Sequence, residues 1–247
     1  MEILIMYKFS LVICYFFSFI VEATILKFIF FIFRIKHKKQ LQYQIKMISK
    51  YSSWILNALE IVIQTNQVTI NNGLIVSNHL SYVDALVISK IYPSLFITSV
   101  EIKNSIGLGW ITKLAGCVFV ERRNRNKLES DTSNIQDILT KGTPVVLFPE
   151  GTSTNGSEIL KFRPALFQSA INAKLPVHSF HISYNHKSVA YYGDMEFLSH
   201  LFSLCRQKNV ISKLIYTGML VADVNYDRKW IAVKTYANIM HEHVSRI

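Results

Sequence analysis

The sequence predicts an α/β fold in which helices cover a mixed, largely parallel sheet. Short apolar runs typical of buried strands alternate with longer runs whose apolar residues recur at helical spacing. Polar motifs directly follow three such strands, as expected where reacting groups gather at the carboxyl ends of parallel strands. The chain of 247 residues suffices for one such domain and a small appendage. We therefore expect a membrane anchor with its basic flank at residues 1–40 and one α/β domain at residues 41–247.

Residues 1–33 form the most apolar part of the chain. An uncharged run extends from Phe9 to Val21, and a second apolar run extends from Phe28 to Phe33. A clean membrane-spanning helix needs about 20 apolar residues, which neither run supplies alone. Three interpretations remain open: one spanning helix, a helical hairpin that enters one leaflet, and a buried core helix. Apolar length and aromatic content favour the two membrane interpretations.

A basic cluster, Arg34-Ile35-Lys36-His37-Lys38-Lys39, directly follows this apolar segment. Anionic lipid headgroups attract such a cluster by about 1 kcal/mol per charge near the surface. Positive charge beside a membrane segment also indicates the cytoplasmic side. We therefore expect a membrane location, contact with anionic lipids, and an active domain on the cytoplasmic face.

The elements of the α/β domain follow in order. Apolar residues at helical spacing predict helices over 44–60, 106–114, 128–139 and 167–173 and from 227 onward. Apolar runs bounded by turn residues predict strands at 61–63, 68–70, 73–76, 95–98, 117–120, 145–148 and 177–183. A further helix is expected to begin near Ala85, with Ser81 at its N-cap.

The first polar motif, Ser77-Asn78-His79-Leu80-Ser81-Tyr82-Val83-Asp84, lies between the 73–76 strand and that helix. A carboxylate that accepts a hydrogen bond from one imidazole nitrogen fixes the tautomer and leaves the other nitrogen free to take a proton. His79 and Asp84 are therefore candidates for a general base and its orienting partner, with the substrate supplying its own hydroxyl. The alternative is a loop histidine that is hydrogen-bonded near a helix start.

Two further motifs follow strands and suit an anionic ligand. Gly116-Cys117-Val118-Phe119-Val120-Glu121-Arg122-Arg123 ends a strand in arginine, whose fork matches a phosphate or carboxylate. Phe148-Pro149-Glu150-Gly151-Thr152-Ser153-Thr154-Asn155-Gly156 ends a strand in a loop whose N–H groups and hydroxyls can turn toward an anion. The alternatives are a charged strand end and a polar turn in which Glu150 forms a structural ion pair.

Four ordered blocks together resemble a known family. They are Asn-His-x-Ser-x-x-Asp, Gly-x-x-Phe-Val-x-Arg, Phe-Pro-Glu-Gly-Thr and Leu175-Pro176-Val177. Their order and spacing, from about residue 72 to residue 185, resemble the glycerolipid acyltransferases, and most closely the bacterial 1-acylglycerol-3-phosphate acyltransferase type. The N-terminal apolar segment is similar to that family's membrane anchor.

The resemblance implies roles for the matching positions. His79 would be the general base, Asp84 its orienting partner, and Arg122 the ligand of the acceptor's anionic head. The acceptor pocket and its walls would use Glu150, Gly151, Thr152, Ser153 and Pro176, with Pro176 near the acyl donor. The donor would be acyl-CoA or acyl carrier protein, and the acceptor a lysophospholipid, foremost 1-acylglycerol-3-phosphate. No metal or organic cofactor is expected.

One position departs from the family pattern. Many members that use a phosphate acceptor carry arginine directly after Glu-Gly-Thr, where this chain has Ser153. Loss of a bidentate ligand should weaken recognition of a phosphomonoester. The variant therefore also resembles acyltransferases for other lysolipids, such as lyso-ornithine lipid. Arg123, Lys161 and Arg163 are the candidates to compensate for the missing cation.

Two rival functions are weaker. The first is a thioesterase or lipase in which His79 activates water. The sequence lacks a nucleophile elbow, Gly-x-Ser-x-Gly, and this function would leave the anion-binding motifs unexplained. A non-catalytic membrane-surface binding protein would have no need of the base, yet His79, Asp84 and Glu150 are all present. His178 and His181 are an odd number of residues apart on a predicted strand, so they are not expected to share a metal.

Overall fold

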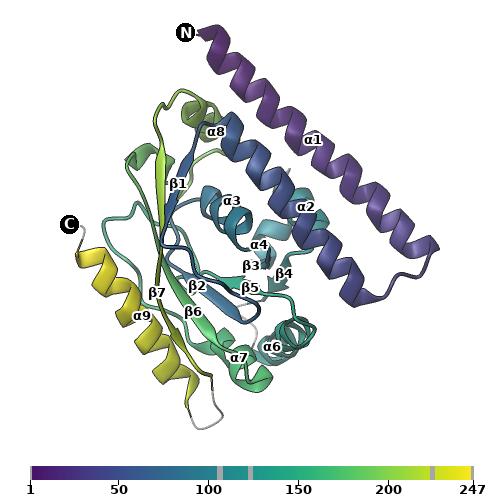
Figure 1. Cartoon of the computed structure of the whole chain (residues 1–247), viewed down its shortest axis with the longest axis vertical. Helices are drawn as coiled ribbons and strands as arrows, with labels where there is room; N and C mark the ends of the chain where they lie inside the picture. The colour runs from purple at the N-terminus through teal and green to yellow at the C-terminus, as the bar shows by residue number, and fades with distance from the viewer. Residues whose placement is uncertain (1, 105–107, 122–124, 223–225, 246–247) are drawn as a thin grey trace.

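The computed structural model describes residues 2–104, 108–121, 125–222 and 226–245. Helices and strands alternate through these residues, and helices cover both faces of one central sheet (Figure 1). In chain order the elements are α1 (Glu2–Ile32), α2 (His37–Ala58), β1 (Val62–Thr65), β2 (Leu74–Ser77), α3 (Tyr82–Ile91), β3 (Leu95–Ser99), α4 (Val100–Lys103), α5 (Leu108–Leu114), β4 (Val118–Val120), α6 (Arg125–Thr140), β5 (Val145–Leu147), the 3-10 helix η1 (Ala165–Phe167), α7 (Gln168–Ala173), β6 (Val177–Tyr184), the 3-10 helix η2 (Lys187–Val189), α8 (Phe197–Cys205), β7 (Ile211–Leu220) and α9 (Arg228–Val244).

The strands form a seven-stranded sheet in the order β1-β7-β6-β2-β5-β3-β4. Neighbouring strands are parallel except β6 and β7, which are antiparallel. The expected mixed, largely parallel sheet is therefore confirmed. The central strand β2 is buried over its whole length, because helices lie on both of its faces.

Alternate residues of the central strands face two separate cores. Leu74 and Val76 pack with side chains from α6, α7 and α9, whereas Ile75 packs with side chains from α1, α3 and α8. This alternation follows from the two-residue period of a strand. Both faces of β2 are thus dry, and its polar continuation after Ser77 emerges only at the carboxyl edge of the sheet.

Helix α1 lies on the outside of α2, on the opposite side of the molecule from α9 (Figure 1). It buries one stripe of side chains, which includes Val12, Phe19, Ala23 and Phe30. Polar side chains of α1 also contact the domain: Lys8 lies 2.6 Å from Glu60, and Lys27 Nζ donates to the Lys113 carbonyl at 3.0 Å. Glu22 lies 2.6 Å from Lys50 and accepts from the Tyr51 hydroxyl at 2.7 Å. The helix is therefore held along most of its length.

The remaining surface of α1 is apolar and exposed. It and the residue after it carry Ile3, Leu4, Met6, Tyr7, Ile13, Phe17, Val21, Ile25, Phe28, Ile29, Phe31, Ile32 and Phe33. By length and composition α1 is long and apolar enough to cross a membrane. It is one continuous helix, and not two short apolar pieces.

Two local predictions were wrong. Residues 68–70 are not a strand: the Val68 N–H donates to the Tyr92 hydroxyl at 3.3 Å instead of joining a ladder. The second helix begins at His37 and not at residue 44. Most exposed side chains in its first turns are charged or amide groups, and Leu41 is the one buried apolar residue among described residues 37–43, so the apolar period is too sparse there to mark the start.

Sheet topology brings two of the polar motifs together. β2 and β5 are adjacent and parallel, with Val76 opposite Leu147. One segment begins at Asn78, directly after β2, and the other begins at Phe148, directly after β5. The two segments therefore leave the sheet side by side. The motif around His79 and the loop after Phe148 consequently occupy one edge of the sheet.

Candidate active site

The first turn of α3 fixes the position of Asp84. Ser81 is the N-cap, and its hydroxyl accepts a hydrogen bond from the Val83 N–H. Asp84 is the third helical residue, and its carboxylate accepts from the Ser81 N–H at 2.9 Å, which completes a capping box. The aspartate is therefore held by helix formation itself. A negative charge is also favourable at this end of the helix.

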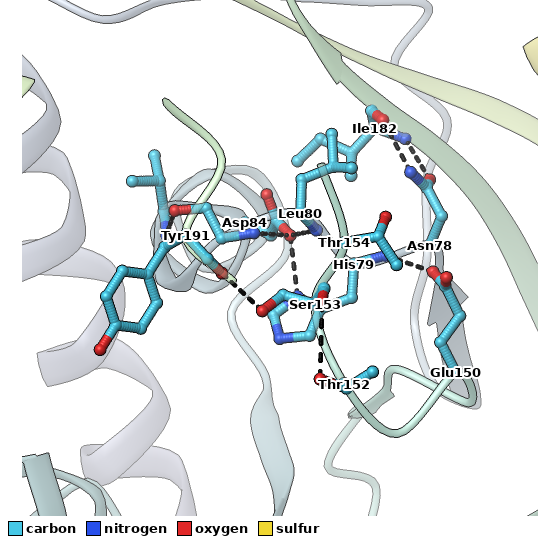
Figure 2. Close-up of polar contacts among 12 residues, drawn as sticks. Asn78, His79, Leu80, Asp84, Glu150, Thr152, Ser153, Thr154, Ile182 and Tyr191 are labelled. Atoms are coloured by element: carbon cyan, nitrogen blue, oxygen red, sulfur yellow. Dashed lines mark hydrogen bonds and ion pairs between the residues drawn. The ribbon is translucent and has the colours of Figure 1, made fainter. Parts of the chain in front are cut away.

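The same carboxylate orients His79. Oδ2 of Asp84 lies 2.8 Å from His79 Nδ1 and also accepts from the Leu80 N–H at 2.6 Å (Figure 2). Oδ1 accepts from the Tyr184 hydroxyl at 2.7 Å. Because these backbone and tyrosine groups donate, the carboxylate acts as an acceptor, and Nδ1 of His79 carries the proton. Nε2 is then the basic nitrogen.

The His79 ring contacts the buried Asp84 carboxylate on one side and is partly exposed to solvent on the other. Its side chain is 22% exposed, whereas that of Asp84 is 0% exposed. The ring stacks on Phe148, with ring centres 4.1 Å apart and planes 13° apart. Among the described residues, Nε2 of His79 has no hydrogen-bond partner. A nitrogen that is basic, oriented and partly exposed can take a proton from a substrate hydroxyl.

Glu150 attaches the loop after β5 to the His79 backbone. Its Oε1 accepts from the His79 N–H at 2.7 Å, and its Oε2 accepts from the Leu160 N–H at 2.8 Å. The Thr154 N–H in turn donates to the His79 carbonyl at 3.0 Å (Figure 2). Burial raises the pKa of Glu150 to about 7, although the two backbone N–H donors oppose that rise. The loop and the histidine therefore form one hydrogen-bonded unit.

The other predicted loop residues lie in the same unit. Gly151 has a φ of 82°, a left-handed value that favours glycine, and it begins the turn away from β5. Thr152 is exposed. The Ser153 hydroxyl donates to the Tyr191 carbonyl at 2.5 Å (Figure 2). The structure thus brings His79, Asp84 and residues 150–153 together, and binding of an acceptor by these loop residues stays a prediction.

Other predicted positions are not part of this unit. Arg122 and Arg123 lie outside the described residues. Lys161 and Arg163 are exposed in the segment that follows the loop. Pro176 lies at the opposite end of the sheet, because its carbonyl accepts from the Leu74 N–H, where β2 begins. The expectation that Pro176 forms a wall of the site is therefore wrong for the part of the site around His79.

Three contacting residues were not singled out from the sequence. Asn78 pairs through its side-chain amide with both the N–H and the carbonyl of Ile182, at 2.8 and 2.9 Å (Figure 2). Phe148 supports the His79 ring, and Tyr184 binds Asp84. Asn78 and Phe148 stand inside quoted motifs, which is the signal that could have found them. Tyr184 has no such local signal.

Three other side chains whose residue types can carry chemistry, Cys117, His178 and His181, lie outside this unit. Burial raises the pKa of the Cys117 thiol to about 12, so it is not a thiolate nucleophile at neutral pH. His178 Nε2 lies 3.1 Å from the Asn72 carbonyl. His181 Nε2 lies 3.2 Å from His243 Nδ1, on α9.

Comparison with known proteins identifies the family of this chain. The profile of the family described as Acyltransferase matches residues 58–183, which include the His79 motif and the loop after β5. The 1-acyl-sn-glycerol-3-phosphate acyltransferase of Neisseria gonorrhoeae is 40% identical over 103 residues, which are 42% of this chain and 40% of that protein. The lyso-ornithine lipid O-acyltransferase of Brucella abortus is 30% identical over 177 residues, 64% of this chain and 66% of that protein.

The fold has a solved counterpart. The crystal structure of the 1-acyl-sn-glycerophosphate (LPA) acyltransferase of Thermotoga maritima superposes with a TM-score of 0.62 at 18% identity. The match covers 98% of this chain and 97% of that chain, so it includes the segment of α1 and α2. At this identity the likeness shows a shared fold.

Proposed function

Because this chain belongs to the Acyltransferase family, we propose that it transfers a fatty acyl group from a thioester donor to the free hydroxyl of a lysolipid. The observation that carries the proposal is the His79–Asp84 pair, with Nδ1 bound to a buried carboxylate and Nε2 on the open side. A lysolipid brings its own hydroxyl, so the site needs no protein nucleophile. Acyl-CoA or acyl carrier protein is the proposed donor.

The reaction follows from the geometry of His79. Nε2 removes the proton from the acceptor hydroxyl while the oxygen attacks the thioester carbonyl. The carbon–sulfur bond then breaks, and the leaving sulfur takes the proton back from the imidazolium. The products are an ester and a free thiol. Asp84 stabilises the transient imidazolium because its carboxylate is 2.8 Å from Nδ1.

The foremost acceptor is 1-acylglycerol-3-phosphate, which would give phosphatidate. The similarity to 1-acyl-sn-glycerol-3-phosphate acyltransferases supports this acceptor, with Arg122 as its proposed phosphate ligand. Glu150, Gly151 and Thr152 are proposed to shape the acceptor side, where Glu150 acts by holding the loop.

A lyso-ornithine lipid is the second candidate acceptor. Ser153 supports it, because a short hydroxyl that donates to the Tyr191 carbonyl stands where many phosphate-using members have arginine. The longer alignment with the lyso-ornithine lipid enzyme of Brucella abortus also supports it.

We further propose that α1 lies in one leaflet of the membrane and does not cross it. Lys8, Glu22 and Lys27 join α1 to the domain, so a crossing helix would draw those polar partners into hydrocarbon. The exposed apolar side of α1 instead suits a position at the membrane interface. The basic cluster at residues 34–39 would contact anionic headgroups and place the domain on the cytoplasmic face.

Radiolabelled acyl transfer to a panel of lysolipids tests the function, with free acid and esterified product separated. His79→Ala should lower turnover by about 10²–10⁴-fold, the usual effect of removing a positioned base. His241→Ala, at an exposed position on α9, is the matched control and should leave turnover unchanged. Near-normal transfer by folded His79→Ala would refute the mechanism. Release of free acid without ester would indicate a thioesterase instead.

A further inference from the structure

The Asp84 carboxylate has a fourth donor that comes from another part of the chain. Three donors, His79 Nδ1 and the Leu80 and Ser81 N–H groups, share Oδ2. The Tyr184 hydroxyl is 2.7 Å from Oδ1. Tyr184 is 100 residues away from Asp84 in the sequence, at the end of β6. The orientation of the carboxylate is therefore set by two independent elements.

Strand β6 contacts the His79 motif at both of its ends. The Asn78 amide, just before His79, pairs with the backbone of Ile182. Tyr184 follows Ile182 by two residues on β6, so the side chains of Ile182 and Tyr184 lie on the same face of the strand. One strand thus fixes the start of the motif through Asn78 and its end through Asp84. The histidine is in the span between these two contacts.

We propose that Tyr184 is a positioning residue for acyl transfer, whose hydroxyl holds the Asp84 carboxylate in the orientation that presents Oδ2 to His79. The inference rests on the proposed function, in which His79 is the base. The Ser81 and Leu80 N–H groups bind only Oδ2, so without Tyr184 the Oδ1 end of the carboxylate has no described donor. The carboxylate would then be held at Oδ2 alone, still beside His79 Nδ1 but without the contact that fixes its plane.

The Tyr184 hydroxyl also reduces the negative charge that the Asp84 carboxylate presents to His79. Burial and the neighbouring Asp84 charge raise the pKa of Tyr184, so it remains a donor throughout the working pH range. A hydrogen bond to Oδ1 withdraws charge from the carboxylate, and its loss would leave more negative charge facing the imidazole. The other titratable groups that interact with this cluster are Glu150, near His79 and Asp84, and Tyr82, near Tyr184.

Tyr184→Phe tests the proposal, because it removes only the hydroxyl. We expect kcat to fall about tenfold with little change in KM, the effect of losing one hydrogen bond to a charged group. The acidic limb of the kcat/KM profile should move to higher pH by about half a unit, because the more concentrated Asp84 charge stabilises protonated His79. The same substrate in both enzymes cancels any titration of the lipid.

Tyr92→Phe is the matched control. Tyr92 is 5% exposed, its ring packs on Phe180 of β6, and its hydroxyl accepts from the Val68 N–H. Tyr92→Phe removes a hydroxyl from the apolar core that also contains Tyr184, and it leaves the contacts of Asp84 unchanged. The acidic limb should stay in place in this variant. A limb that moves equally in both variants would overturn the inference, as would normal kcat and an unmoved limb in Tyr184→Phe.

Two further measurements distinguish misfolding of Tyr184→Phe, a wrong role for Tyr184 and a wrong role for His79. If Tyr184→Phe does not fold, 3-fluorotyrosine at position 184 retains the hydroxyl and makes it a stronger donor. The limb should then move to lower pH, and an unmoved limb overturns the inference. Comparison with His79→Ala distinguishes the two proposals: inactive His79→Ala with normal Tyr184→Phe removes only the role of Tyr184. Active, folded His79→Ala removes the base mechanism itself.

Discussion

Asp84 has two functions that cannot be separated. Its carboxylate caps the first turn of α3 through the Ser81 N–H and also binds His79 Nδ1. The sequence spacing of His79 and Asp84 is thus explained by helix geometry, since the third helical residue reaches back to the N-cap. Any replacement of Asp84 therefore alters the start of the helix as well as the orientation of the His79 ring.

Ser153 is the residue that we expect to control acceptor selectivity. Wild type should acylate lysophosphatidate and also at least one acceptor without a phosphomonoester. Ser153→Arg should raise the ratio of kcat/KM values in favour of lysophosphatidate by roughly tenfold to a hundredfold, because a charged hydrogen bond contributes about 1.5–3 kcal/mol. Competition between the two acceptors in one detergent measures the ratio and removes differences in micelle partitioning.

Ser153→Ala is the control for that substitution. It removes the hydrogen bond to the Tyr191 carbonyl without adding a cation, so any change shared by both variants comes from the loop and not from charge. Strict selectivity of wild type for lysophosphatidate, with an unchanged ratio in Ser153→Arg, would contradict the prediction. Arg123, Lys161 and Arg163 would then be the next positions to replace.

Much of the residue-scale site could be predicted because its parts are local. His79, Ser81 and Asp84 lie within one strand–turn–helix segment, and their contacts follow from that segment alone. Tyr184 could not be predicted, because it meets Asp84 only through the pairing of β6 with β2. The use of both Glu150 oxygens by backbone N–H groups likewise depends on how the loop closes.

At the scale of elements, α1 combines two surfaces that the sequence pattern did not separate. Its buried stripe and its exposed side are both apolar, so hydrophobicity alone indicated a membrane segment without showing which side contacts protein. The side of α1 that packs against the domain is determined by residues elsewhere in the chain, such as Glu60 and Lys50. The choice between a spanning and a surface helix therefore depends on tertiary contacts.

Alkaline carbonate extraction tests how α1 is held. The whole chain should remain in the membrane pellet, because burial of the exposed apolar side of α1, and not charge, provides the attachment. A variant with Arg34, Lys36, Lys38 and Lys39 all replaced by serine is the control, and it should also stay in the pellet. Recovery of wild type in the supernatant would show that this side of α1 is covered by protein.

The same dependence on tertiary contacts explains the success and failure of element prediction. Buried strands such as β2 and β5 were predictable because both faces are apolar. The ten-residue strand β7 was not, since Lys213, Thr217 and Gly218 interrupt its apolar pattern and its pairing partner β6 lies well before it in the chain. Residues 68–70 have strand-forming side chains but do not join the sheet formed by the described strands.

At the scale of the whole molecule, the structure predicts which side faces the membrane. Trp110 on α5 is 68% exposed, and α5 is joined to α1 by the Lys27 contact. Trp230 is 40% exposed and belongs to α9. Helix α9 lies across the sheet from α1 (Figure 1). Trp residues are common at membrane interfaces. Trp110 should therefore lie within reach of lipid, and Trp230 should not.

Fluorescence quenching by brominated lipids measures this orientation. Two variants are compared, each with Trp54→Phe and a second Trp→Phe change that leaves either Trp110 or Trp230. Vesicles that contain brominated lipid should quench Trp110 strongly and Trp230 weakly. Equal quenching of the two would refute the proposed orientation, and so would preferential quenching of Trp230.

The docking of α1 against the domain has a kinetic consequence. An enzyme held on one leaflet meets its lipid acceptor by lateral diffusion in a plane, not by collision in solution. Its rate should follow the mole fraction of lysolipid in the bilayer. Adding inert phospholipid at constant total lysolipid should therefore slow the reaction, even though the bulk concentration is unchanged. The proposed donors, acyl-CoA and acyl carrier protein, are water-soluble, so the rate should depend on their concentration in the aqueous phase.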